Sequence, residues 1–344
     1  MTQLTGYMHG VNLGGWLSQC NYEKSHCDIF ITENDIKTIK SWGMDHVRLP
    51  VDYNIFQDKD GKFIDYGFAY VDNCIKWCKE NQLNMILDLH KTVGYSFDAG
   101  EKETGLFDAD SPYQAQFLAL WEEFTKRYAK YEDMLSFELL NEVTDQSYCK
   151  AWNALAKQCI QLIRKSAPTI KILVGSYWNN SVTSVKDLDD PYDDNIIYNF
   201  HCYDPLIFTH QGAPWVGPQM NHDFRMAYDS VFADYQKFSN EKLSQMSPSF
   251  AGFQQDKAPD TSYFETLFAE TLKVAEERKV RLYCGEYGVI DRVAPEEMLK
   301  WYKDISAVFN KYGIGRAAWS YKKMDFGISD ARLDGVRSEL LKLL

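Results

Sequence analysis

The chain has 344 residues, of which 45% are apolar and 15% aromatic, enough for a large hydrophobic core in one big domain or two ordinary ones. Its formal charge of −12, without any basic run, argues against nucleic-acid partners, because contacts to phosphates need a basic face. No stretch approaches the ~20 apolar residues of a transmembrane helix, so we also expect no membrane partner.

Short apolar runs alternate with helical patterns along the whole chain. The runs are continuously apolar, which is typical of parallel strands buried on both faces. The predicted strands are Met8–Asn12, Met44–Leu49, Leu83–Leu89, Met134–Leu140, Ile170–Ser176, Ile196–Phe200, Val280–Cys284 and Arg316–Ser320.

Helices are predicted in most of the gaps between these strands. Apolar residues recur at helical spacing, Pro112 and Pro295 mark helix starts, and Gly313 marks a helix end. The clearest predicted helices are 66–81, 113–130, 262–278 and 296–312. Eight alternations of strand and helix predict a (β/α)₈ TIM barrel, with a doubly wound open sheet as the alternative.

One connection is much longer than a single crossover helix needs. It follows the sixth strand, where Pro205–Asp260 is rich in aromatic residues and should form a small helical insertion. No internal repeat or low-complexity linker divides the chain. We therefore expect residues 1–344 to form a single domain, with residues 205–260 as an inserted helical lid.

Polar and aromatic side chains gather at the predicted carboxyl ends of the strands, the edge that opens into the ligand crevice of α/β proteins. Each alone could have a structural role, but their shared position at one end of a barrel is improbable by chance. They are Arg48 on the second strand, His90 on the third, Asn141 and Glu142 on the fourth, His201 and Tyr203 on the sixth, Glu286 on the seventh and Trp319 on the eighth.

Glu142 and Glu286 are the most informative members of this set. Each ends an apolar run, where a charged side chain is unexpected unless it has a function. Two carboxylates that face one crevice from different strands are the usual equipment for cleaving a glycosidic bond.

The motifs around these residues resemble glycoside hydrolase family 5. The resemblance runs in order and spacing from Gly10 to Trp319, and Val143 stands where the family commonly has proline after the acid/base, a change that should affect only local rigidity. Within the family the chain is most similar to clostridial-type cellulases with a helical insert after the sixth strand, while its opening motif also resembles yeast-type exo-1,3-glucanases. The motifs are Gly10-Val-Asn-Leu-Gly-Gly-Trp16, Val47-Arg48-Leu49-Pro50, Asp88-Leu89-His90, Leu140-Asn141-Glu142, His201-Cys202-Tyr203, Gly285-Glu286-Tyr287-Gly288 and Trp319.

The resemblance implies a retaining mechanism in which Glu142 is the acid/base and Glu286 the nucleophile. The other matched residues would assist: Arg48 and Tyr203 hold Glu286, His201 bonds Glu142, Asn141 and His90 bind sugar hydroxyls, and Trp319 stacks on the pyranose ring. Trp178, at the end of the fifth strand, is predicted from its position as a further sugar platform.

We therefore predict an endo-β-glucanase that cleaves β-1,4 bonds in cellulose-like or mixed-linkage glucans. An exo-β-1,3-glucanase or a β-mannanase on the same scaffold remains an alternative. A non-catalytic sugar-binding barrel is disfavoured, because a binding protein needs neither glutamate. The expected partner is a β-glucan poly- or oligosaccharide, and we expect a monomer.

No cofactor or metal is expected. The eight cysteines form no CxxC pair or zinc spacing, and no nucleotide-binding fingerprint is present, so the thiols should be reduced and mostly buried. The segment Met1–His9 lacks the features of a signal peptide, so the localisation is left open between the cytoplasm and, if a leader has been removed, the cell exterior.

Overall fold

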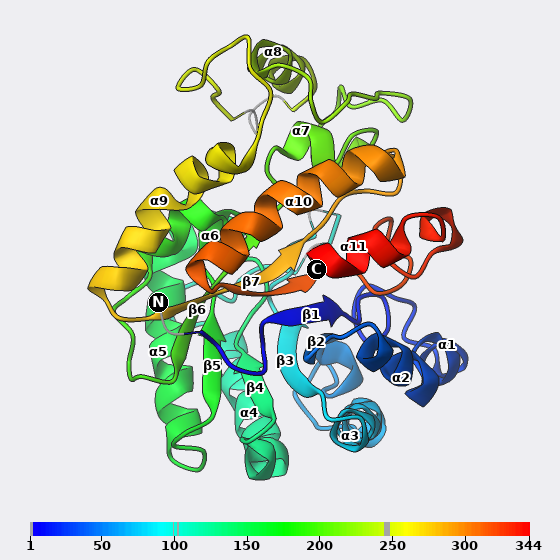
Figure 1. Ribbon diagram of the computed structural model, residues 1–344. Helices are drawn as coiled ribbons and strands as arrows, with labels where there is room; N and C mark the ends of the chain where they lie inside the picture. Colours follow the sequence, from blue (N-terminus) through cyan, green and yellow to red (C-terminus); the bar gives the residue numbers. More distant parts are fainter. Residues whose placement is uncertain (1–2, 99, 102, 244–247) are drawn as a thin grey trace.

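The computed structural model describes residues 3–98, 100–101, 103–243 and 248–344. Eight parallel strands follow one another around a closed barrel, and β8 pairs with β1 (Figure 1). The predicted (β/α)₈ barrel is confirmed. The strands are β1 (His9–Asn12), β2 (His46–Asp52), β3 (Asn84–Lys91), β4 (Leu135–Glu138), β5 (Lys171–Val174), β6 (Ile196–Cys202), β7 (Arg281–Tyr287) and β8 (Gly315–Ala318).

Every predicted strand is present, but several end elsewhere than predicted. β3, β6 and β7 continue past their apolar runs, so His90, His201 and Glu286 lie within strands rather than after them, while β2 runs beyond Arg48 to Asp52. β4 instead stops at Glu138, which places Glu142 in the loop beyond it. Polar residues continue these strands because their side chains point into the barrel and find partners there, as described below.

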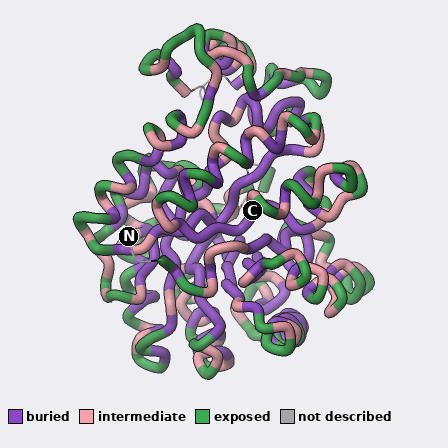
Figure 2. The backbone as a smooth tube through the Cα atoms, viewed as in Figure 1, coloured by how far each residue is buried: buried purple, intermediate pink, exposed green. Residues whose placement is uncertain are grey.

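Helices form the outer layer of the barrel. In Figure 2 their outward faces are exposed, while the strands beneath them are buried. The helices are α1 (Lys24–Phe30), α2 (Glu33–Ser41), α3 (Asp65–Glu80), α4 (Pro112–Tyr128), α5 (Cys149–Arg164), α9 (Thr261–Glu277), α10 (Pro295–Tyr312) and α11 (Arg337–Leu343). None in the described ranges is long and apolar enough to cross a bilayer. All eight cysteines are free thiols, six of them buried.

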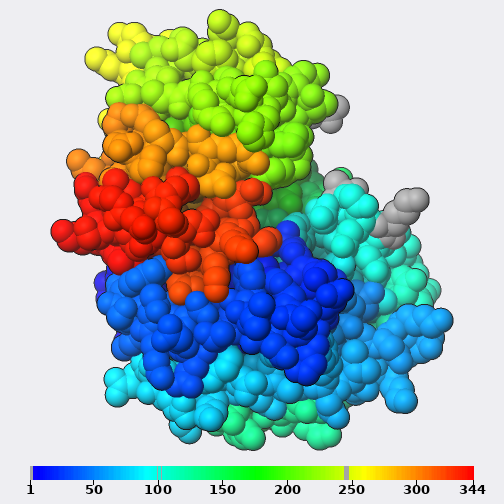
Figure 3. All heavy atoms as spheres, turned by 90° about the vertical axis from the view of Figure 1, so that its right-hand side faces the viewer, coloured from blue at the N-terminus to red at the C-terminus, as the bar shows by residue number. Residues whose placement is uncertain are grey.

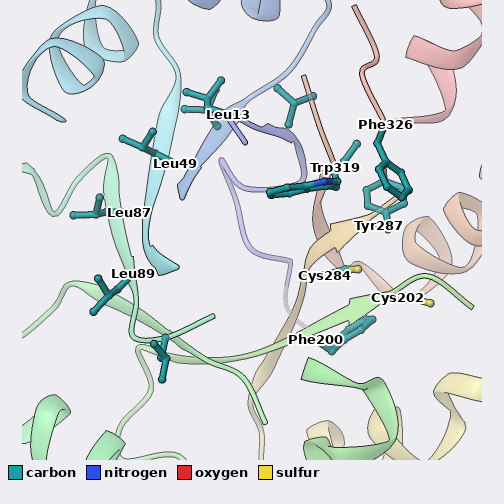
Figure 4. Packing of buried hydrophobic residues seen from close by; sticks show 14 of the residues in the cluster. Leu13, Leu49, Leu87, Leu89, Phe200, Cys202, Cys284, Tyr287, Trp319 and Phe326 are labelled. Atoms are coloured by element: carbon teal, nitrogen blue, oxygen red, sulfur yellow. The ribbon is translucent and has the colours of Figure 1, made fainter. Parts of the chain in front are cut away.

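The core has two parts, separated by the barrel wall. The larger part lies between strands and helices, and Figure 4 shows Leu49, Leu87 and Leu89 pointing to this outer side, while Trp319 points towards the barrel interior. The smaller part is a separate apolar cluster of residues from five strands, with Ile86, Leu173, Ile197 and Tyr283 among its members, together with Leu4 and Tyr7 ahead of β1. Arg48, Asp88 and His90 alternate with the outward-pointing leucines and therefore face the interior.

The connection between β5 and β6 differs from the other crossovers. Its described helical pieces are only α6 (Tyr177–Asn180) and the 3₁₀-helix η4 (Val182–Asp187). Trp178, Asn179 and Asn180 all have left-handed backbones, with φ of 50°, 55° and 56°. A short, tightly wound loop therefore stands at the carboxyl end of β5.

The long connection after β6 contains α7 (Leu206–Thr209), the 3₁₀-helix η5 (Pro214–Val216) and α8 (Phe232–Lys242). Residues 244–247 of the predicted insertion lie outside the described residues. Phe232 stacks on Phe253 with ring centroids 4.6 Å apart and also contacts Tyr263 of α9. This aromatic cluster attaches the segment to the barrel. In Figure 3 the yellow-green segment after β6 lies at the top of the molecule, against the orange segment that includes α10.

Candidate active site

Arg48 is the centre of the polar cluster inside the barrel. Its guanidinium is fully buried and forms a bidentate pair with Glu138, through Nε at 2.7 Å and Nη2 at 2.8 Å. Nη1 donates to Glu286 at 2.8 Å, and Nη2 lies 3.0 Å from Asp88. Nη2 also donates to Asn141 at 2.9 Å. One arginine therefore holds three carboxylates, which compensates for their removal from water.

Glu138 and Asn199 belong to this cluster but were not among the predicted site residues. Asn199 on β6 donates to Glu138 Oε1 at 2.8 Å, so this oxygen accepts a second hydrogen bond beside the one from Arg48. Burial raises the pKa of Glu138 and the charge of Arg48 opposes this shift. Glu138 interrupts the apolar run Leu135–Leu140, and a charge inside a buried strand needs a partner, so the sequence did carry a sign of it.

Glu286 is buried on β7, with both carboxylate oxygens bonded. Oε1 accepts from Arg48, and Oε2 accepts from the Tyr203 hydroxyl at 2.8 Å. Burial and the neighbouring carboxylates hold the pKa of Tyr203 well above its usual value, so the hydroxyl remains a donor. These two bonds aim the carboxylate and stabilise its charge.

Glu142 stands opposite, in the loop after β4, with a left-handed backbone at φ 44°. His201 Nδ1 lies 2.7 Å from its Oε1, and Asn179 Nδ2 donates to its Oε2 at 3.1 Å. The Tyr95 hydroxyl donates to its backbone carbonyl at 2.7 Å. Burial raises the pKa of Glu142, and the hydrogen bond from Asn179 partly offsets that rise. Burial lowers the pKa of His201 to about 4, so its ring is neutral at ordinary pH.

The two glutamates are close to each other. One ligand atom each from Glu142, Glu286 and His201 lie within 4.8 Å of one another. Carboxyl groups about 5 Å apart suit a direct attack on the anomeric carbon, whereas a water placed between them needs roughly 6.5–9.5 Å. The three groups also have the ligand types of a cation site, but hydrogen bonds already occupy each of their carboxylate oxygens.

His90 and Trp319 form a second wall of the site. His90 Nδ1 lies 2.7 Å from Asp88 Oδ2, and the imidazole is parallel to the Trp319 ring, with centroids 5.7 Å apart. Burial raises the pKa of Asp88 to about 7, against the lowering effect of Arg48. A Cβ on Gly14 would approach the Trp319 ring to 2.7 Å, so only glycine leaves room for this ring.

Trp178 lies farther out, at the rim. It is 53% exposed on α6, next to the residue that bonds Glu142, a position open to a ligand. Of the aromatic residues in the loop after β3, Tyr95 packs against Phe107, which in turn stacks on Tyr148, so these two rings pack within the protein. Residues 99 and 102 of that loop lie outside the described residues.

The chain as a whole has counterparts among known proteins. The family model described as cellulase (glycosyl hydrolase family 5) matches residues 6–325. Cellodextrinase A of Ruminococcus flavefaciens is 46% identical over 316 residues, covering 92% of this chain and 86% of that protein.

Two further proteins are similar over nearly the whole length. Endoglucanase C of Acetivibrio thermocellus is 37% identical over 350 residues, covering 99% of this chain and 98% of that protein. The crystal structure of endoglucanase Cel5A from the hyperthermophilic Thermotoga maritima shares the fold, with a TM-score of 0.76 at 23% identity over 98% of this chain and 97% of that one. The chain therefore belongs to glycosyl hydrolase family 5, the cellulase family.

Proposed function

We propose that this chain is a retaining endo-β-glucanase with Glu142 as the acid/base and Glu286 as the nucleophile. The observation that carries the assignment is the close approach of the two carboxylates in different environments. Glu286 is held by a cation and a phenol, while Glu142 is partly buried beside a neutral imidazole. The names of the relatives support a β-1,4-glucan as the substrate and do not favour β-1,3-glucan or mannan.

In the first step, Glu286 attacks the anomeric carbon while Glu142 gives its proton to the glycosidic oxygen. An ester bond forms between Glu286 and the sugar, and the aglycone leaves as an alcohol. In the second step, Glu142 takes a proton from water, whose oxygen attacks the same carbon. Glu286 leaves as a carboxylate, and the product keeps the β configuration. The raised pKa of Glu142 suits it to carry the proton in the first step.

Asn141 is the residue best placed to bind a sugar hydroxyl. Its Oδ1 accepts from Arg48, which fixes the orientation of the amide, and its Nδ2 is buried without a partner in the described part of the chain. A buried, unpaired donor costs about 1–3 kcal/mol, which a ligand acceptor would recover. A contact to the sugar 2-hydroxyl, which strengthens in the transition state, accounts for it.

The substrate is tested by product analysis on carboxymethyl-cellulose, barley β-glucan, laminarin and mannan. We expect rapid cleavage of the first two. Proton NMR of the earliest products should show the β anomer before mutarotation. Cleavage confined to laminarin or mannan would contradict the substrate, and an α anomer would contradict the mechanism.

Replacing Tyr203 by Phe should lower kcat about 10–100-fold, because it removes a hydrogen bond to a charged group and almost no volume. Steady-state kinetics and the thermal midpoint would be measured together. Tyr70→Phe is the matched control, since the Tyr70 hydroxyl also donates to a carboxylate, Asp28, outside the site. Full activity in Tyr203→Phe would exclude the supporting role.

We further propose that the chain is one domain and that residues 205–260 act as a lid over the cleft. The segment begins directly on the site, where the His210 ring packs edge-on against Tyr203 with centroids 4.9 Å apart. Trp215 is 56% exposed, with the Arg292 guanidinium 5.5 Å from the centre of its ring, so much of this aromatic side chain is open to solvent. Lids at a barrel rim admit substrate and then exclude water.

Replacing residues 213–257 by a short Gly/Ser linker is expected to leave a folded barrel with an altered product profile. The linker spares His210 and its contact with Tyr203. Circular dichroism would report folding, and oligosaccharide products from barley β-glucan would report the profile. A folded variant with unchanged products on every glucan would contradict the lid.

We also propose that the enzyme acts as a monomer on a polysaccharide, without nucleic-acid or membrane partners. All the residues assigned above come from one chain, and the charge of −12 disfavours anionic partners. Light scattering after size exclusion tests the oligomeric state.

A further inference from the structure

The loop after β5 contacts both members of the Glu142–His201 pair. Asn179 Nδ2 donates to Glu142 Oε2 at 3.1 Å, and Asn180 Nδ2 lies 3.4 Å from His201 Nε2. Two backbone bonds fasten this loop to the loop that carries Glu142, from Trp178 N to Thr144 O and from Asn179 N to Val143 O.

The backbone is shaped to make these contacts. Three consecutive left-handed residues direct the Asn179 side chain towards Glu142 and the Asn180 side chain towards His201. Asparagine tolerates this backbone conformation better than most residues. A Cβ on Gly175 would come within 2.2 Å of the Asn180 amide, and one on Gly285 within 3.0 Å of His201 Nε2. Gly175, just after β5, and Gly285 on β7 therefore leave the space on either side of β6 that Asn180 and His201 fill.

We infer that Asn179 and Asn180 are positioning residues that hold the Glu142–His201 pair in one tautomer and favour the carboxylate form of Glu142. The inference rests on the acid/base role proposed for Glu142. If Asn180 donates to Nε2, the neutral ring carries its proton on Nδ1 and donates it to Glu142 Oε1. Both Glu142 oxygens then accept hydrogen bonds, which suits a base that takes a proton from water.

The proton that Glu142 gives away in the first step therefore sits on Oε2, because Oε1 faces the His201 donor. The Asn179 amide faces the same oxygen and stabilises it once the proton has left. The other charged or titratable groups around Glu142 are Arg48 on β2, Asp88 and His90 on β3, Tyr95 in the next loop, Tyr203 after β6 and Glu286 on β7. None of these groups is altered in the variants below.

The test uses two variants that keep the left-handed backbone, Asn179→Gly and Asn179→Asp. Glycine removes the donor, and aspartate replaces it by a negative charge, so both should keep Glu142 protonated to higher pH. The alkaline limb of kcat/KM should move up by about 0.5 pH unit in Asn179→Gly and by about 1 unit or more in Asn179→Asp. Asn153→Asp on α5 is the control, since Asn153 donates to the Asp187 carbonyl and is not part of the site.

Two aryl β-cellobiosides separate positioning from general damage. A phenyl leaving group needs the proton of Glu142, whereas a 2,4-dinitrophenyl group leaves without it. The shift of the alkaline limb should appear with the phenyl substrate only. An equal loss of activity on both substrates would overturn the inference.

The tautomer is tested directly by NMR of ¹⁵N-histidine-labelled protein. His201 should show a protonated Nδ1 in the wild type and a mixture of tautomers in Asn180→Gly. A protonated Nε2 in the wild type would overturn the inference. If Glu142→Gln is fully active, the proposed function itself fails. If Glu142→Gln is inactive but both Asn179 variants keep the wild-type alkaline limb, only this inference fails.

Discussion

Glu286→Ala is expected to lower kcat on an aryl β-cellobioside by roughly 10⁴-fold or more, because no glycosyl ester can then form. Azide should restore turnover by entering the space that the carboxylate leaves. Its attack on the face used by Glu286 gives the α-glycosyl azide. Glu142→Ala should instead yield the β-glycosyl azide, because azide then replaces the water that attacks the ester.

The two azide products make this experiment specific to the assignment. Proton NMR distinguishes the anomers, and the thermal midpoint checks that both variants fold. Glu265→Ala is the control, since Glu265 pairs with Lys311 on the outer helices. The reverse result, a β-glycosyl azide from Glu286→Ala and an α-glycosyl azide from Glu142→Ala, would mean that the two glutamates have been assigned the wrong roles.

Arg48→Ala should be the most destabilising single change in the site, by about 3–5 kcal/mol of unfolding free energy. Among the arginines and lysines of the described residues, only Arg48 pairs with Glu138, Asp88 and Glu286, and all three carboxylates are buried. Removing it leaves their negative charges together in a medium that stabilises them poorly. Activity should fall as well, since Glu286 loses one of its two hydrogen bonds.

This loss of stability should depend on pH in a defined direction. Burial raises the pKa of Asp88 to about 7 and also raises that of Glu138, while unfolded carboxyl groups titrate near about 4. The folded state therefore binds more protons than the unfolded state between about pH 4 and 7, so stability falls as pH rises through that window. Without the charge of Arg48, the pKa values of Asp88 and Glu138 should rise further. Arg48→Ala should therefore be more destabilised at pH 8, where both groups would have to ionise, than at pH 5.

Urea unfolding of the wild type and the variant at both pH values measures this difference. Arg316→Ala is the control, because Arg316 is also buried but donates to neutral partners, Asn310 and the Leu343 carbonyl. Its loss of stability should be similar at both pH values. An Arg48→Ala variant with an equal loss at pH 5 and pH 8 would contradict the account of the cluster.

The sequence by itself determined the fold class and most of the site. Apolar runs long enough to be buried on both faces, separated by helical segments, require a parallel sheet covered by helices, and eight of them favour closure. In a barrel of parallel strands all carboxyl ends lie on one side. Residues such as Glu142 and Glu286 could therefore be placed together from their positions in the chain, without knowledge of any contact.

The tertiary structure alone decided which residues pair and how. Whether Glu138 points into or out of the barrel depends on where β4 stops and on its register with β3, which a run of apolar letters does not specify. The contact of Asn179 with Glu142 likewise depends on three left-handed residues and on the docking of two loops. Such contacts join positions far apart in the chain through short, directional hydrogen bonds. A hydrophobic pattern in the sequence indicates which residues are buried, but not the direction in which a buried polar side chain points.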